Sequence, residues 1–140
     1  MDWQNVREIL EQASSIAIIG AKDKAGQPVD RVGRYLMEAG YDVIPVHHTR
    51  KNVWGLETCE KLTDIERPVH IVVLFRAAEQ CPQHAQEALL LSRLPLLFWM
   101  QLGIEHPASA SALAGEGVHV VQNACIMVEH ARLFGRQILA

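Results

Sequence analysis

The sequence is poor in cysteine, in long apolar runs and in positive charge. Its three cysteines are odd in number and form no C-x-x-C pair, which argues against a disulfide framework or a zinc site. The longest apolar run, residues 94–100, is too short to span a bilayer. The formal net charge of −3 argues against general binding to nucleic acid, whose phosphates demand many Lys and Arg side chains.

These deficits predict where the protein works and what it does not bind. The first ten residues lack the charged-then-apolar order of a signal peptide, and cysteine usage fits a reducing compartment. We therefore expect a cytoplasmic protein with neither a nucleic-acid nor a membrane partner. A protein partner is left open.

What the chain does contain is a regular alternation of apolar runs and amphipathic segments. The 140 residues suit one domain, 1–140, in which an N-terminal helical segment, 1–13, precedes a core of 14–134. Residues 51–65 look irregular, with one helical turn near Cys59. Strands are predicted at 15–20, 41–46, 69–75, 95–100 and 118–121, and helices at 28–40, 82–92, 107–114 and from Asn123 through Met127, Ala131, Phe134 and Ile138.

Five strand–helix repeats predict an α/β fold, namely a Rossmann-like three-layer α/β/α sandwich around a five-stranded, mostly parallel sheet. Ligands of such sheets bind beyond the carboxyl ends of the strands. Candidate residues are therefore sought directly after each strand.

The turn after the first predicted strand has one glycine, Gly20, where NAD-binding turns carry three. Without a Cβ, Gly20 would let a phosphate or ribose approach the backbone, and Lys22 and Lys24 could reach phosphates. The start of the following helix also suits an anion. The alternative is an ordinary strand end with solvated lysines. Gly33, inside that helix, is expected to pack closely on a strand rather than to contact a ligand.

The end of the second predicted strand is basic. NAD-binding enzymes usually place an acid there, but Asp42 lies at the opposite end, roughly 16 Å away at 3.3 Å per residue. His47, His48, Arg50 and Lys51 follow the strand instead. Positive charge at this point accepts a phosphorylated ribose, which NADP and coenzyme A (CoA) both carry. The alternative is a solvated basic loop, and no metal site is predicted from the paired histidines.

The remaining strand ends supply further candidates. Phe75 could lie against an adenine or a pantetheine arm or belong to the core, and Arg76 could pair with a phosphate. Gln101 is a polar group at the ligand edge, and Gly103 permits close backbone approach. Cys125, in the first turn of the last helix, could form a mixed disulfide with a thiol ligand or pack as a small apolar residue.

Motifs for chemistry are absent from the sequence. It has no G-x-S-x-G, P-loop or H-E-x-x-H pattern. Glu129 and His130 could join Cys125 in a catalytic set, but adjacent helical side chains point about 100° apart and do not form a relay. The sequence therefore favours binding over catalysis and predicts no catalytic residue.

Several segments together resemble a known family. "IAIIGAKDK…P…RVGRYLMEAGYDVIPV", "VHIVVLFR", "FWMQLGI" and "ACIMVEHARL" resemble the CoA-binding domain family of small bacterial and archaeal proteins, over roughly residues 14–134. They are also similar to the CoA-binding domain of the succinyl-CoA synthetase alpha subunit. The resemblance implies a Rossmann-like domain that binds CoA or an acyl-CoA and has no established activity of its own.

The resemblance also implies roles for particular residues. The turn at Gly20 would meet the nucleotide end of CoA, Val46 and His47 would flank the adenosine, and Phe75 and Gln101 would line the rest of the cleft. The candidate ligand-binding residues are Gly20, Ala21, Lys22, Lys24, Arg34, Val46, His47, Phe75, Arg76, Gln101, Gly103 and Cys125.

This chain departs from the family pattern at two places. Family members commonly show Pro-Val-Asn-Pro after the second strand, where this chain has Pro-Val-His-His at 45–48. They also show Asp-Arg-Cys before the last helix, where it has Asn-Ala-Cys at 123–125. Two other functions fit the same fold: an NADP-dependent oxidoreductase, and a protein-interaction module that binds no nucleotide.

Overall fold

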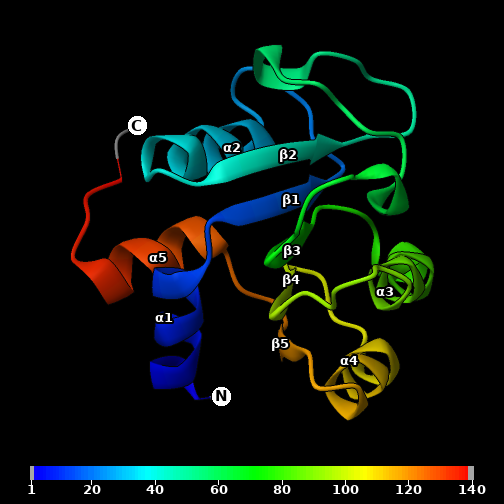
Figure 1. Ribbon diagram of the computed structural model, residues 1–140. Helices are drawn as coiled ribbons and strands as arrows, with labels where there is room; N and C mark the ends of the chain where they lie inside the picture. The colour runs from blue at the N-terminus through cyan, green and yellow to red at the C-terminus, as the bar shows by residue number, and fades with distance from the viewer. Residues whose placement is uncertain (1, 139–140) are drawn as a thin grey trace.

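The computed structural model describes residues 2–138 as a five-stranded parallel sheet with helices on both faces (Figure 1). Met1 and residues 139–140, which the sequence predicts to belong to the same domain, lie outside the described residues. The strand order is β2-β1-β3-β4-β5, so the predicted α/β fold class is confirmed. The strands are β1 (Ser15–Ile19), β2 (Asp42–Val46), β3 (Ile71–Leu74), β4 (Leu97–Met100) and β5 (His119–Val121), and the helices are α1 (Trp3–Gln12), α2 (Pro28–Glu38), α3 (Cys81–Leu89), α4 (Pro107–Gly115) and α5 (Ile126–Phe134).

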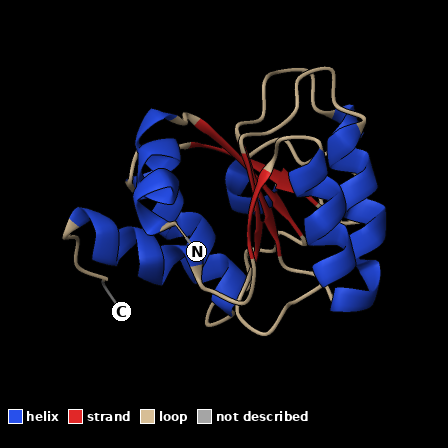
Figure 2. Cartoon of the chain, turned by 90° about the horizontal axis from the view of Figure 1, so that it is seen from below, coloured by secondary structure: helices blue, strands red, loops and turns tan. Residues whose placement is uncertain are grey.

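The sheet is buried on both faces, which explains why its strands read as continuous apolar runs rather than alternating ones. Ile16 and Ile18 of β1 belong to one core, which α1, α2 and α5 cover. Ala17 and Ile19 belong to a second core, which α3 and α4 cover. Figure 2 shows the strands enclosed between these two groups of helices. Trp99 of β4 is fully buried on the first face.

The last helix begins later than predicted. Asn123 does not cap it: its backbone is left-handed (φ 55°), and its side-chain oxygen accepts a hydrogen bond from the Gly103 N–H at 2.7 Å. Cys125 is the N-cap residue and Ile126 the first helical one, so Cys125 precedes the first turn. The helix ends at Phe134, which leaves the expected stripe residue Ile138 outside it and 37% exposed.

The segment between β2 and β3 is irregular, as expected. It contains two short 3₁₀ turns, η1 (Val53–Gly55) and η2 (Leu62–Asp64), and the second begins three residues after Cys59, near which one helical turn is predicted. Cys59 itself forms an isolated parallel bridge with Val46, which the sequence does not predict.

Trp54, in η1, clamps this segment onto α2 and the loop after β1. Its indole Nε1–H donates to the buried Asp30 carboxylate at 2.8 Å, and its backbone N–H donates to Asp23 at 3.1 Å. Asn52 and Trp54 both take left-handed backbone conformations (φ 53° and 54°) to place the ring. A Cβ on Gly33 would overlap that ring. Gly33 thus packs against Trp54, a contact that the sequence does not predict.

This contact predicts an inverted effect of Gly33→Ala. Alanine inside a helix normally stabilises by about 1 kcal/mol relative to glycine. Here the added methyl displaces the Trp54 ring, and overpacking should leave the protein destabilised by about 1–2 kcal/mol in urea unfolding. In a Trp54→Ala background the same substitution should stabilise. Stabilisation of the protein that retains Trp54 would contradict the packing.

His130 of α5 is a buried ionisable group held neutral by its surroundings. The Tyr35 hydroxyl oxygen and the His130 Nδ1 share a hydrogen bond of 2.8 Å, and the Tyr41 and Phe134 rings lie 5.7 Å and 4.6 Å away between centroids. Burial, and secondarily the positive charge of Arg136, lowers the His130 pKa from 6.5 to about 4. The seam between α2 and α5 therefore excludes a proton that the unfolded chain would accept.

This shift predicts a loss of stability in mild acid. Above pH 6.5 the residue is neutral whether folded or not; between 6.5 and 4 only the unfolded chain takes up the proton, so stability falls as the pH falls. The full effect is up to about 3 kcal/mol. The urea midpoint of unfolding should fall between pH 7 and pH 4.5, and this fall should be smaller in a His130→Phe variant than in the unsubstituted protein. Equal pH dependence in both would refute the assignment.

Candidate functional site

The carboxyl ends of β1, β2 and β3 meet beside a cavity of about 230 Å³. The chain leaves β1 toward β2 on one side and reaches β3 on the other, so this is the switch point at which doubly wound sheets bind ligands. The cavity is lined by Ile19, Val46, His47, His48, Glu60, Lys61, Arg76, Gln80, Gln83, His84 and Glu87.

Basic side chains from the loops after β2 and after β3 converge on this cavity. His47 and His48 follow β2 and stack their rings at 4.7 Å between centroids, and Arg76 follows β3. Burial lowers the His47 pKa below 6.5, and the positive charges of His48, Arg50, Arg76 and Lys22 lower it further. The same positive potential that lowers the His47 pKa attracts anions, so this cluster favours binding of a negatively charged group.

His47 has a defined tautomer. Its Nδ1 accepts hydrogen bonds from the backbone N–H groups of Thr49 (3.1 Å) and Arg50 (3.0 Å). Two donors at Nδ1 leave the ring proton of the neutral form on Nε2. His47 therefore acts as a neutral hydrogen-bond donor within a cationic cluster.

Gly20 joins the three strand ends. Its N–H and that of Ala21 both donate to the Val46 carbonyl, at 2.9 Å and 3.2 Å. Its backbone is left-handed (φ 88°), and a Cβ would lie 2.5 Å from the Phe75 carbonyl oxygen. The space that the sequence predicts to be open to a ligand is thus filled by the protein's own backbone.

Several other candidates lie outside the cavity. Phe75 is half-buried and packs on the core that faces α1, α2 and α5, while Arg76, the next residue, lines the cavity. Gln101 is buried, and its side-chain oxygen accepts from the Ile126 N–H at 2.9 Å, which satisfies the start of α5. Arg34 pairs with Asp30 at 3.0 Å.

The cavity therefore brings together only part of the predicted set. Val46, His47 and Arg76 line it, and the charge of Lys22 acts on His47 beside it. Glu129 and His130 pair with Arg132 and Tyr35, respectively. The candidates outside the lining are Gly20, Ala21, Lys22, Lys24, Arg34, Phe75, Gln101, Gly103 and Cys125.

Sequence reasoning missed the wall contributed by the segment after β3. Gln80, Gln83, His84 and Glu87 line the cavity from η3 (Ala78–Gln80) and α3. His84 Nδ1 and a Glu87 carboxylate oxygen are 2.8 Å apart, so these two side chains satisfy each other. Their spacing of three and four residues places them on one helical face, and that periodicity was the signal that could have revealed them.

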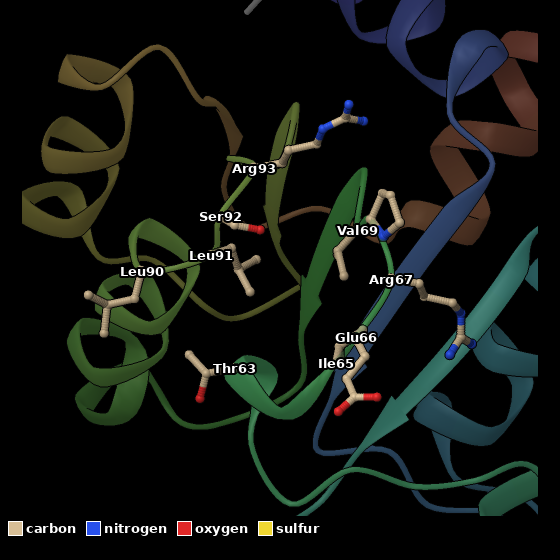
Figure 3. A pocket seen from close by; sticks show the side chains of 10 residues that line it. Thr63, Ile65, Glu66, Arg67, Val69, Leu90, Leu91, Ser92 and Arg93 are labelled. Atoms are coloured by element: carbon tan, nitrogen blue, oxygen red, sulfur yellow. The ribbon is translucent and has the colours of Figure 1, made fainter.

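A second cavity, of about 430 Å³, lies at the opposite, amino-terminal edge of the sheet. Figure 3 shows that its side chains come from the segment before β3 and from the segment that links α3 to β4. Arg67 turns toward β2, where it forms a bidentate pair with Asp42 (2.8 Å and 3.1 Å). This edge lacks the converging strand-end loops where ligands of such sheets bind.

Known proteins resemble this chain over most of its length. The sequence profile described as CoA binding domain matches residues 14–131. The chain belongs to the CoA binding domain family. It is 33% identical over 126 residues to the uncharacterized protein YneT of Bacillus subtilis (strain 168), covering 90% of this chain and 92% of that protein.

Solved structures of the same family share the fold. A Thermus thermophilus protein described as cell-free ID.343 is 40% identical with a TM-score of 0.89, over 96% of this chain and all (100%) of that one. A hypothetical protein from Pyrococcus horikoshii OT3 is 29% identical with a TM-score of 0.91, over 96% and 94%. Within residues 2–138, no helix of this family member has the length and apolar character needed to cross a membrane.

The His47 environment predicts a measurable titration. In ¹⁵N-detected NMR, His47 should be the Nε2–H tautomer at pH 7 and should titrate below 6.5. Arg76→Gln removes one nearby cation and should raise that midpoint, whereas Arg93→Gln, at the opposite edge, should leave it unchanged. A midpoint above 6.5, or an Nδ1–H tautomer, is incompatible with the described hydrogen bonds.

Proposed function

We propose that this protein binds CoA or an acyl-CoA, with the 3′-phosphorylated adenosine end at the carboxyl edge of β1, β2 and β3. The observation that carries the proposal is the cluster of basic side chains, Lys22, His48, Arg50 and Arg76, around the neutral donor His47 beside the 230 Å³ cavity. The family to which the chain belongs supports the same ligand. Binding, rather than catalysis, is the role proposed.

The charge distribution favours a phosphorylated ribose over an unmodified one. NAD-binding sites place a carboxylate at the end of the second strand to accept hydrogen bonds from ribose hydroxyls. Here His47 follows β2, while Asp42 begins it and is held in the Arg67 ion pair, which lowers the Asp42 pKa. A 3′-phosphate adds close to two negative charges, which Arg and Lys side chains bind through charge-assisted hydrogen bonds.

Different lining residues would contact different parts of the ligand. Ile19 and Val46 are apolar and adjoin the basic groups, so a base can lie against carbon while its phosphates meet the cations. Four other candidates would shape the site without bonding to the ligand through the groups already used within the protein. These groups are the backbone N–H of Gly20, Ala21 and Gly103 and the side-chain oxygen of Gln101. The pantetheine arm would continue along the strand ends toward Phe75 and Cys125.

Titration calorimetry with CoA, dephospho-CoA, NAD and NADP tests this proposal. We expect CoA to bind most tightly and dephospho-CoA at least 10-fold more weakly, since one charge-assisted hydrogen bond contributes about 1.5–3 kcal/mol. Arg76→Gln should weaken CoA binding by about 10-fold and affect dephospho-CoA far less. Arg93→Gln, an exposed arginine at the other edge, is the matched control.

Three outcomes would overturn the proposal. Equal affinity for CoA and dephospho-CoA would remove the role of the 3′-phosphate. Preference for NADP over CoA, accompanied by hydride transfer, would favour the oxidoreductase alternative. Binding of none of the four nucleotides would favour an interaction module on the same fold.

A further inference from the structure

One buried acceptor in the cavity has no donor. The side-chain oxygen of Gln80 is shielded from solvent and forms no hydrogen bond among the described residues. Gln80 lies in η3, directly before α3, and lines the 230 Å³ cavity. Buried acceptors in folded proteins are almost always paired, so an exception on a cavity wall marks the place of a missing donor.

Three other polar side chains that line the cavity are already bonded. His84 and Glu87 bond to each other at 2.8 Å, and the His47 Nδ1 is filled by two backbone N–H groups. The shielded Gln80 oxygen forms no hydrogen bond among the described residues, so turning the amide to place this acceptor in the cavity breaks no bond at that atom. The apolar walls at Ile19 and Val46 favour a flat heterocycle between them and the amide.

We infer that Gln80 determines base specificity by reading the 6-amino group of adenine, an inference that rests on the proposed binding of CoA. The amide oxygen accepts from the exocyclic amine, while the amide Nε2–H₂ donates to the adjacent ring nitrogen, N7. This is the bidentate pairing by which Gln and Asn select adenine elsewhere. A 6-oxopurine presents two acceptors, O6 and N7, on the same edge and cannot satisfy both ends of the amide in either orientation.

The test compares adenosine 3′,5′-bisphosphate with inosine 3′,5′-bisphosphate, which differ only in the base. Calorimetry on the unsubstituted protein should give roughly 10- to 100-fold tighter binding of the adenosine compound. Gln80→Met keeps the length of the side chain without its polar atoms and should reduce this ratio toward one. Gln86→Met, an exposed residue of α3 outside the cavity, should keep the full ratio.

A second measurement distinguishes a specificity residue from a structural one. Because the Gln80 oxygen is unpaired in the ligand-free protein, Gln80→Met should leave its melting temperature equal or higher. A marked fall in melting temperature would assign Gln80 a structural role and overturn the inference. So would equal binding of the two bisphosphates by the unsubstituted protein, a result that leaves CoA binding intact. Failure of CoA itself to bind would instead remove the proposed function and this inference together.

Discussion

The carbonyl oxygen of Val46 accepts hydrogen bonds from both Gly20 and Ala21, and the rest of the site depends on this junction. It holds the ends of β1 and β2 together at the point where their loops diverge. Gly20 is confined from the other side by the Phe75 carbonyl, which leaves no room for a Cβ. The ends of three strands are thereby held in one arrangement before any side chain meets a ligand.

Trp54 extends that constraint to the loops. Its two hydrogen bonds to Asp23 and Asp30 and its packing on Gly33 tie the segment after β2 to the segment after β1. Those segments carry His47, His48 and Arg50 on one side and Lys22 on the other. Like charges brought this close repel one another, so a rigid scaffold is needed to keep them together in the absence of an anion.

The proposed complex would combine two kinds of selectivity that act on different parts of a nucleotide. The cations would recognise charge and respond to salt, whereas the Gln80 oxygen, unpaired in the ligand-free protein, would recognise a hydrogen-bond donor at one position. Both features destabilise the ligand-free protein, because the clustered cations repel one another and the buried Gln80 oxygen has no hydrogen-bond donor. Such costs are typical of binding sites, where the ligand supplies the compensating interaction.

The apolar runs, and the Gly and Pro residues between them, determined the strand–helix alternation and the parallel sheet, because burial and local conformational preference act over a few residues. The basic residues after β2 could likewise be read from the sequence. The sequence therefore predicted His47, Val46 and Arg76 correctly as neighbours of one edge. Tertiary structure decided what lies opposite them: the Gln80 and His84 wall, the Phe75 carbonyl against Gly20, and the Trp54 ring against Gly33. These contacts join residues from separate loops, and only the packing of helices on the sheet sets the distances between them.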